Sequence, residues 1–151
     1  MPTDDPRPDA FGSLFVLVQH LTNRLDAALE PMGLTSRQWL LLAVVERGFG
    51  GGAPSLSEAA RQFGTSRQNV KAIAEGLERR GWVSLQPDPR DRRTTLIHLT
   101  DKIGRFHEPD TEAQGEALLA VAFAGLDPDD VSALRTLVVR MVAGLQHTTE
   151  D

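Results

Sequence analysis

Two helix-start signals separated by a short turn lie in the middle of the chain. Residues 55–58, Ser-Leu-Ser-Glu, have the capping-box pattern, in which the first serine and the glutamate satisfy each other's exposed backbone amides. A similar pattern, Thr-Ser-Arg-Gln, recurs at residues 65–68. Gly64 and Gly81 follow the two apolar stretches as helix stops. Two helices joined by so short a turn predict a helix-turn-helix.

A pair of short alternating segments follows this motif. We expect strands at Trp82–Gln86 and Thr94–Leu99, separated by the sequence Pro-Asp-Pro-Arg-Asp-Arg-Arg at residues 87–93. Pro87 and Pro89 have no amide hydrogen to donate, so the ladder is expected to stop before them. The pattern predicts a hairpin with a charged loop, called the wing below.

Apolar residues at helical spacing precede this region. One helix is expected from Phe11 to a stop at Pro31 and Gly33, and a second from Thr35 to Val45, again with a capping pattern at its start. Residues 48–54, which contain four glycines, end the second helix.

More helices are expected after the wing. Thr100 begins one, which Pro109 should kink or interrupt before it resumes over residues 112–124. Asp127 and Pro128 are typical of the start of a last helix. The fold class expected is therefore mainly α with a small β-hairpin (α+β), a winged helix-turn-helix with flanking helices.

Length and composition indicate one domain. The chain has 151 residues, of which 40% are hydrophobic. Three prolines and three acids in residues 1–9 predict a flexible tail over residues 1–10, leaving residues 11–151 as a single domain. The longest apolar run, Ala117–Gly125, is too short to cross a membrane, and the first residues do not resemble a signal peptide. We therefore expect a cytoplasmic protein without a membrane partner.

Positive charge is concentrated in the predicted helix-turn-helix and wing. The formal net charge of the chain is −5, which taken alone argues against nucleic acid. Residues 61–93, however, contain eight basic and four acidic side chains, whereas the rest of the chain contains 8 and 17. A positive segment on an acidic body favours binding of a polyanion.

One face of the second helix of the motif is suited to DNA. With Val70 buried, helical geometry places Gln68 and Ala72 on the solvent side, where a glutamine can pair with adenine and an alanine can contact a thymine methyl. Residues near the helix start can reach phosphates. The DNA-binding residues expected on and before this helix are Thr65, Ser66, Arg67, Gln68, Asn69, Lys71 and Ala72.

The wing is expected to contribute two arginines to DNA binding. Arg90, at the tip, can enter a narrow minor groove, and Arg92 can accompany it or bind phosphate. Asp88, Asp91 and Arg93 are expected to hold the shape of the loop through charge-assisted hydrogen bonds, with Asp88 and Arg93 as the pair.

These motifs resemble the MarR family of bacterial transcriptional regulators. The wing followed by Leu-Thr-x-x-x-Gly is the most specific part of the resemblance, which extends in outline over residues 11–147. The segments that carry it are Ser-Arg-Gln-Asn-Val-Lys at 66–71, Leu-Glu-Arg-Arg-Gly-Trp-Val at 77–83, Asp-Pro-Arg-Asp-Arg-Arg at 88–93 and Leu-Thr-Asp-Lys-Ile-Gly at 99–104.

The resemblance implies a homodimer and a regulated repressor. Residues 11–34 and 101–147 would form a helical dimerisation region and residues 35–100 the DNA-binding region, with repression relieved by a small ligand. Two departures are present: Leu85 stands where many members have arginine, and Pro109 falls where the family usually has one long helix.

A ligand site is expected between the dimerisation helices and the DNA-binding region. Family members often hold anionic aromatic ligands there, and His20, Arg24 and Trp39 are the candidates in this chain. The alternative is that Trp39 belongs to the core and that His20 and Arg24 are polar interface residues.

The sequence offers no support for a metal, a cofactor or a catalytic centre. The four histidines lack helical i, i+4 partners, and there is no cysteine, so a thiolate site and a disulfide are both excluded. The glycine run lacks the lysine and hydroxyl of a P-loop. We expect that the protein is not an enzyme.

The function expected is that of a sequence-specific DNA-binding transcriptional regulator. It would act as a repressor and bind an inverted-repeat operator in double-stranded DNA as a homodimer, with possible release by a small anionic or aromatic ligand. The alternative is a winged-helix protein-interaction module that has lost DNA binding. The acidic total charge, Glu75 on the groove face and Leu85 favour this alternative.

Overall fold

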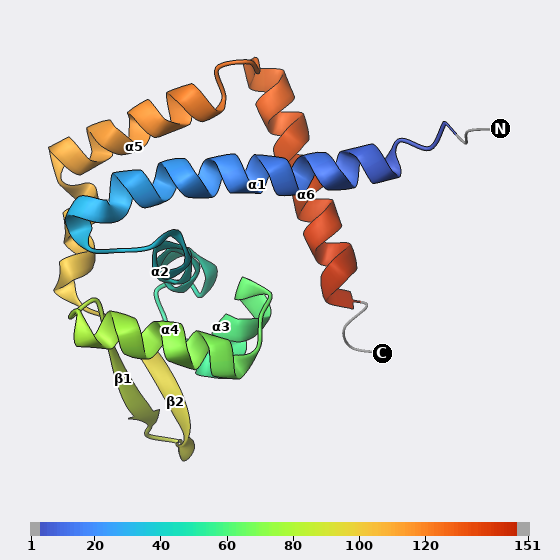
Figure 1. Ribbon diagram of the computed structural model, residues 1–151. Helices are drawn as coiled ribbons and strands as arrows, with labels where there is room; N and C mark the ends of the chain where they lie inside the picture. Colours follow the sequence, from blue (N-terminus) through green and yellow to red (C-terminus); the bar gives the residue numbers. More distant parts are fainter. Residues whose placement is uncertain (1–3, 148–151) are drawn as a thin grey trace. The chain divides into compact units, whose positions relative to one another are not determined.

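The computed structural model of the chain describes residues 4–147 (Figure 1). The chain divides into two units, residues 1–36 and 37–151, and each is considered by itself. The first unit contains the helix α1 (Arg7–Leu29) and the short 3-10 helix η1 (Glu30–Met32), which ends at Gly33 with a left-handed φ of 67°. Residues 7–10, expected in a flexible tail, are helical instead. The first turn of a helix tolerates proline, because the amide hydrogen that proline lacks would have no partner there.

The second unit is mostly helical, with one two-stranded antiparallel sheet. The predicted fold class is therefore confirmed. Its elements are α2 (Ser36–Gly48), α3 (Leu56–Phe63), α4 (Arg67–Arg79), β1 (Val83–Asp88), β2 (Asp91–Leu99), the 3-10 helix η2 (Asp101–His107), α5 (Pro109–Ala122) and α6 (Pro128–His147).

The core of the second unit lies in the winged helix-turn-helix. Every element from α2 to β2 contributes buried apolar side chains, with Trp82 the largest of those that are fully buried. The core side chains are Leu41, Leu42, Val45, Leu56, Ala59, Ala60, Val70, Ala74, Leu77, Trp82, Val83 and Ile97. No residue of α5 or α6 belongs to this core.

The two predicted capping patterns have different outcomes. At α3 the capping box is complete, because Ser55 Oγ accepts from the Glu58 amide at 3.1 Å and the Glu58 carboxylate accepts from the Ser55 amide at 2.7 Å. At α4 the cap is Ser66 rather than Thr65, since Ser66 Oγ accepts from the Asn69 amide at 3.1 Å. Gly64, with a left-handed φ of 79°, ends α3 as predicted.

The hairpin is longer than the sequence predicts. The ladder continues to Asp88 opposite Asp91, with a bulge after Pro87, and only Pro89 and Arg90 form the turn. Pro87 lies opposite Thr95, two residues after Leu85, whose backbone amide points away from β2. The amide hydrogen that Pro87 lacks would also point away from β2, so no ladder bond is lost. In consequence Arg92 and Arg93 lie on β2 and not in a loop.

The interruption expected at Pro109 is confirmed. The residues after Thr100, whose side chain caps the element, form the 3-10 helix η2, and Pro109 begins α5 as its first residue. Because a proline cannot donate to the preceding turn, η2 and α5 are separate elements. None of the helices in residues 4–147 combines the length and the hydropathy needed to span a membrane.

Candidate nucleic-acid interface

The solvent face of α4 carries the predicted DNA-contacting residues. Gln68, Lys71 and Ala72 are exposed, whereas Val70 and Ala74 are fully buried against the core. The face is therefore presented as the sequence predicts. Lys71 Nζ lies 3.9 Å from the Glu75 carboxylate one turn later, and both side chains are about half exposed. This exposed pair contributes little to stability, so Lys71 can exchange its partner for a phosphate at small cost.

The residues at the start of α4 divide into two groups. Ser66 and Arg67 are exposed at the helix N-terminus, where backbone amides favour an anion. Asn69 is half-buried, and its side-chain amide donates to Thr65 Oγ1 at 2.9 Å. The Asn69 side chain thus holds the turn between α3 and α4 through one of its two amide hydrogens, and the expected phosphate contact would use the other.

The wing tip presents Arg90 to solvent. The Arg90 side chain is 93% exposed, while its backbone amide donates to the Asp88 carboxylate at 2.9 Å. The Arg90 guanidinium lies 3.8 Å from the same carboxylate. Asp88 therefore fixes the turn, and the Arg90 side chain beside it stays exposed to solvent.

The predicted pair of Asp88 with Arg93 is wrong. Arg93 is held by Asp91, whose carboxylate accepts from the Arg93 amide at 3.2 Å and from Nε at 3.1 Å. Asp88 pairs with Asp91 in the ladder and its carboxylate is taken by Arg90, so Arg93 is held by Asp91 on its own strand. Arg92, between them on the strand, is exposed.

Three contacts at the base of the wing were not foreseen. Thr100 Oγ1 donates to the Gly81 carbonyl at 2.6 Å, and Lys102 Nζ donates to the Arg80 carbonyl at 2.7 Å. The Leu85 amide donates to the carboxylate of Glu78 at 2.7 Å. Each contact ties the end of α4 to the hairpin or to the segment after it. A sequence pattern does not reveal them, since the partners are between 7 and 22 positions apart.

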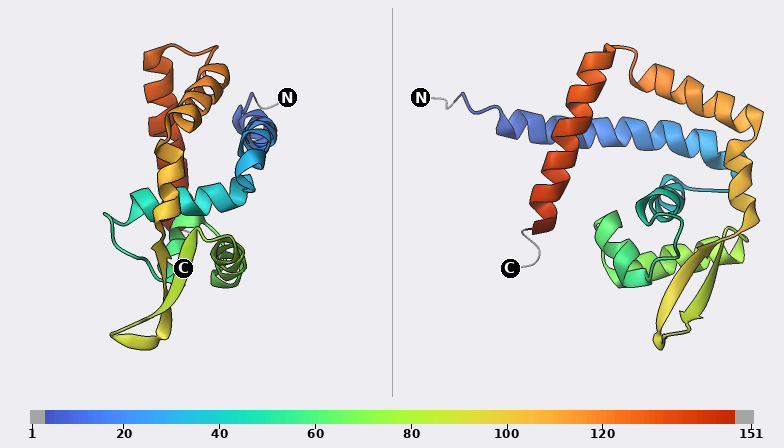
Figure 2. Two further views of the ribbon diagram at one scale, coloured as in Figure 1. Left: turned by 90° about the vertical axis from the view of Figure 1, so that its left-hand side faces the viewer. Right: turned by 180° about the vertical axis from the view of Figure 1, so that it is seen from behind.

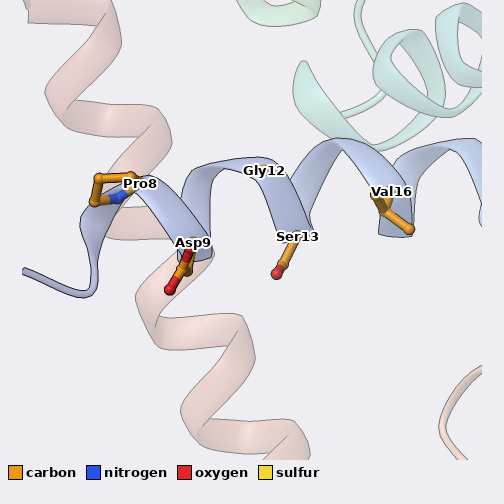
Figure 3. A pocket seen from close by; sticks show the side chains of 5 residues that line it. All are labelled: Pro8, Asp9, Gly12, Ser13 and Val16. Atoms are coloured by element: carbon orange, nitrogen blue, oxygen red, sulfur yellow. The ribbon is translucent and has the colours of Figure 1, made fainter.

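The expected ligand residues belong to two different units. His20 and Arg24 are exposed one turn apart on α1, and Trp39 is half-buried on α2. An open hollow lies on α1 itself, lined by Pro8, Asp9, Gly12, Ser13 and Val16 (Figure 3). This hollow contains none of the three candidates and no basic side chain, so it does not suit an anionic ligand. A site built from His20, Arg24 and Trp39 stays a prediction.

Metal chemistry has no support in the described part of the chain. Residues 4–147 hold no group of three or more histidine or acidic side chains placed to bind a metal ion. His107 Nε2 lies 3.2 Å from the Glu46 carboxylate and Nδ1 lies 4.0 Å from that of Glu112, which links η2 to α2 and α5.

Comparison with known proteins decides the family. The MarR family model matches residues 32–94, which include the helix-turn-helix and most of the wing. The protein Rv2011c of Mycobacterium tuberculosis is 32% identical over 135 residues, which are 89% of this chain and 91% of that protein. The transcriptional activatory protein BadR of Rhodopseudomonas palustris is 34% identical over 105 residues, 67% of this chain. The chain belongs to the MarR family. This family consists of transcriptional regulators and not of enzymes.

Solved MarR-family structures share the fold. A MarR-family regulator from Rhodococcus sp. RHA1 matches with a TM-score of 0.77 and 23% identity, covering 93% of this chain and 96% of that one. A mutant MarR from E. coli, solved with operator DNA, matches with a TM-score of 0.75 and 21% identity over 90% of this chain and 96% of that one. The chain spans only 59% of the length of BadR.

Proposed function

We propose that this MarR-family protein binds an inverted-repeat operator as a homodimer and represses the adjacent gene. One α4 would lie in each of two major grooves, about one helical turn apart, with each wing in the flanking minor groove. The observation that carries the proposal is the exposed polar face of α4 beside a hairpin whose tip arginine is 93% exposed. The MarR structure with operator DNA supports it by analogy of fold.

The distribution of exposed apolar residues supports the homodimer. Large apolar side chains of α1 and α6 are exposed even though the winged helix-turn-helix has a complete core. Such surfaces are usually covered by a partner. The exposed residues on these two helices are Phe11, Phe15, Val16, Leu17, Val18, Leu21, Leu137, Val138, Val139, Met141, Val142 and Leu145.

The sign of regulation in this proposal depends on where the operator lies. An operator that overlaps a promoter gives repression, since the bound dimer excludes the polymerase. Among the relatives, BadR is an activatory protein and MprA of Escherichia coli a repressor. A regulator of this kind would act on the chromosome, in the cytoplasm. A promoter-reporter assay with and without the protein tests the repressor role, and a rise in reporter output on adding the protein would contradict it.

Arg90→Ala should weaken operator binding about 10- to 30-fold. Two wing arginines are lost per dimer, and an exposed charge-assisted contact contributes about 1 kcal/mol in a hydrated groove. The slope of log affinity against log salt should also fall by about 0.9 per lost phosphate contact. Fluorescence anisotropy with a labelled promoter fragment, over a salt series, measures both quantities.

Arg93→Ala is the matched control for this experiment. Its side chain is 92% exposed on the same hairpin, but Asp91 holds its guanidinium. We expect a change of less than about threefold. Equal losses for the two variants would show that the wing acts only as diffuse positive charge. Failure of the native protein to bind any genomic fragment would favour the protein-interaction module, for which the net charge of −5 is the argument.

We also propose that a small aromatic anion regulates the protein through His20 and Arg24, which are exposed one turn apart on α1. Two proteins of this fold bind or are regulated by molecules with an aromatic ring: CouR of Rhodococcus jostii was solved bound to p-coumaroyl-CoA, and BpsR of Bordetella bronchiseptica is regulated by 6-hydroxynicotinic acid. A ligand at 100 times its Kd should stabilise the folded state by about 2.7 kcal/mol. A thermal-shift screen of aromatic acids measures this, and Arg24→Ala should abolish the shift. A hit whose shift survives Arg24→Ala would place the site elsewhere.

A further inference from the structure

The carboxylate of Glu78 joins α4 to the wing. Glu78 lies in the last turn of α4, and its Oε2 accepts a hydrogen bond from the backbone amide of Leu85 at 2.7 Å. Leu85 lies on β1, the first strand of the hairpin. A side chain of the DNA-facing helix is thus bonded directly to the backbone of the wing.

The amide that Glu78 binds is one that the sheet leaves open. Leu85 faces Ile97 in the antiparallel ladder, and the Ile97 amide donates away from β1, to the carbonyl of Pro54 at 2.8 Å. Facing residues in such a ladder direct their backbone groups either both toward or both away from each other. The Leu85 amide therefore lies on the outer edge of β1, where Glu78 supplies its acceptor.

The hairpin is consequently held from both edges at a single cross-strand pair. Glu78 holds Leu85 from α4, and Pro54 holds Ile97 from the segment before α3. The hairpin projects past α3 and α4, as Figures 1 and 2 show. Arg90 is five positions after Leu85, a distance of at most about 16 Å at the usual rise of a strand.

The length of this projection makes its angle important for DNA binding. A rotation of about 10° at the Leu85–Ile97 pair moves the tip by about 3 Å, which is half the width of a minor groove of about 6 Å. Arg90 can therefore reach its groove while α4 occupies the major groove only if the angle between the hairpin and α4 is fixed.

We propose that Glu78 is a positioning residue that sets this angle and so allows α4 and Arg90 to bind DNA together. The inference rests on the proposed function, because it presupposes operator binding. It also predicts that removal of the Glu78 carboxylate changes DNA affinity in the direction opposite to the one expected from charge alone. Removing a carboxylate near phosphates should raise affinity if its charge alone mattered, whereas loss of the positioning bond should lower affinity.

The test is a double-mutant cycle between Glu78 and Arg90, with operator affinity measured by anisotropy at one salt concentration. Glu78→Ala should weaken operator binding about 5- to 10-fold. Adding Arg90→Ala to Glu78→Ala should weaken it by less than about a further twofold, because a misplaced wing contributes little to affinity. Glu78→Gln, which keeps an oxygen acceptor, should stay within about twofold of the native protein.

Glu75→Ala is the matched control on the same helix. The Glu75 carboxylate pairs with Lys71, and its removal should leave operator affinity unchanged or raise it. In the Glu75→Ala background, Arg90→Ala should weaken binding as much as it does in the native protein. Additive effects of Glu78→Ala and Arg90→Ala would overturn the proposal. So would an increase in affinity on Glu78→Ala.

A second measurement needs no DNA and separates this inference from the proposed function. Amide hydrogen exchange followed by NMR should show Leu85 exchanging at least about tenfold faster in Glu78→Ala, with Ile97 unchanged because its acceptor is the Pro54 carbonyl. Unchanged exchange at Leu85 would overturn the positioning role even if operator binding is confirmed. If the native protein binds no DNA, the proposed function fails, whatever the exchange at Leu85.

Discussion

Phe15→Lys should disrupt the proposed homodimer and weaken operator binding at least 100-fold. Phe15 is 64% exposed on α1 and stacks edge-to-face on Phe11, which is 63% exposed, with ring centroids 5.0 Å apart. Burying a phenylalanine contributes about 1.5–3 kcal/mol, and a two-fold dimer contains the residue twice. The loss of about 3–6 kcal/mol corresponds to a rise in the dimer Kd of about 10²–10⁴-fold.

The monomer should keep its folded winged helix-turn-helix, since Phe15 is not part of that core. Light scattering after gel filtration measures the oligomeric state, circular dichroism the helix content, and anisotropy the operator affinity. Ser13→Lys adds the same charge on the other side of the same helix, beside Val16 and Leu17, and so tests whether that side also belongs to the proposed interface. A Phe15→Lys protein that stays dimeric would remove α1 from the proposed interface, and a monomer with native affinity would contradict dimeric operator binding.

Local signals in the sequence predicted the helical elements well. Capping residues, stop glycines and helix-breaking prolines act within a few residues of their own position, so the capping box at Ser55, the stop at Gly64 and the break at Pro109 are all confirmed. The shift of the α4 cap to Ser66 is a small error between two neighbouring hydroxyl residues.

The wing was harder to predict because its register depends on the partner strand. The missing amide hydrogen of Pro87 predicts that the ladder ends there, but pairing with Thr95 sets the direction in which that hydrogen would point. The partner of Arg93 also depends on the register of the hairpin and on the position of its bulge, which the sequence does not show. The contact of Glu78 with Leu85 has the same origin: it depends on which edge of β1 faces α4.

A buried indole at the base of the wing provides the last prediction. Trp82 is fully buried, with its ring 5.3 Å from that of Phe106 and with Lys102 Nζ 4.8 Å from its centroid. Its Nε1–H has no hydrogen-bond partner among the described residues. Packing and the unpaired donor therefore act in opposite directions on stability.

Trp82→Ala should lower the free energy of unfolding by about 3–5 kcal/mol, because it leaves a large cavity between the hairpin and η2. Trp82→Phe should cost less than about 1.5 kcal/mol, since it keeps a ring beside Phe106 and removes an unsatisfied donor that itself costs about 1–3 kcal/mol. Urea unfolding followed by circular dichroism, at one protein concentration, measures both variants. Trp39→Phe, at a half-buried position, is the control for loss of an indole. If Trp82→Phe is as costly as Trp82→Ala, the indole N–H has an acceptor in solution, and the base of the wing is held by one more hydrogen bond than the described contacts include.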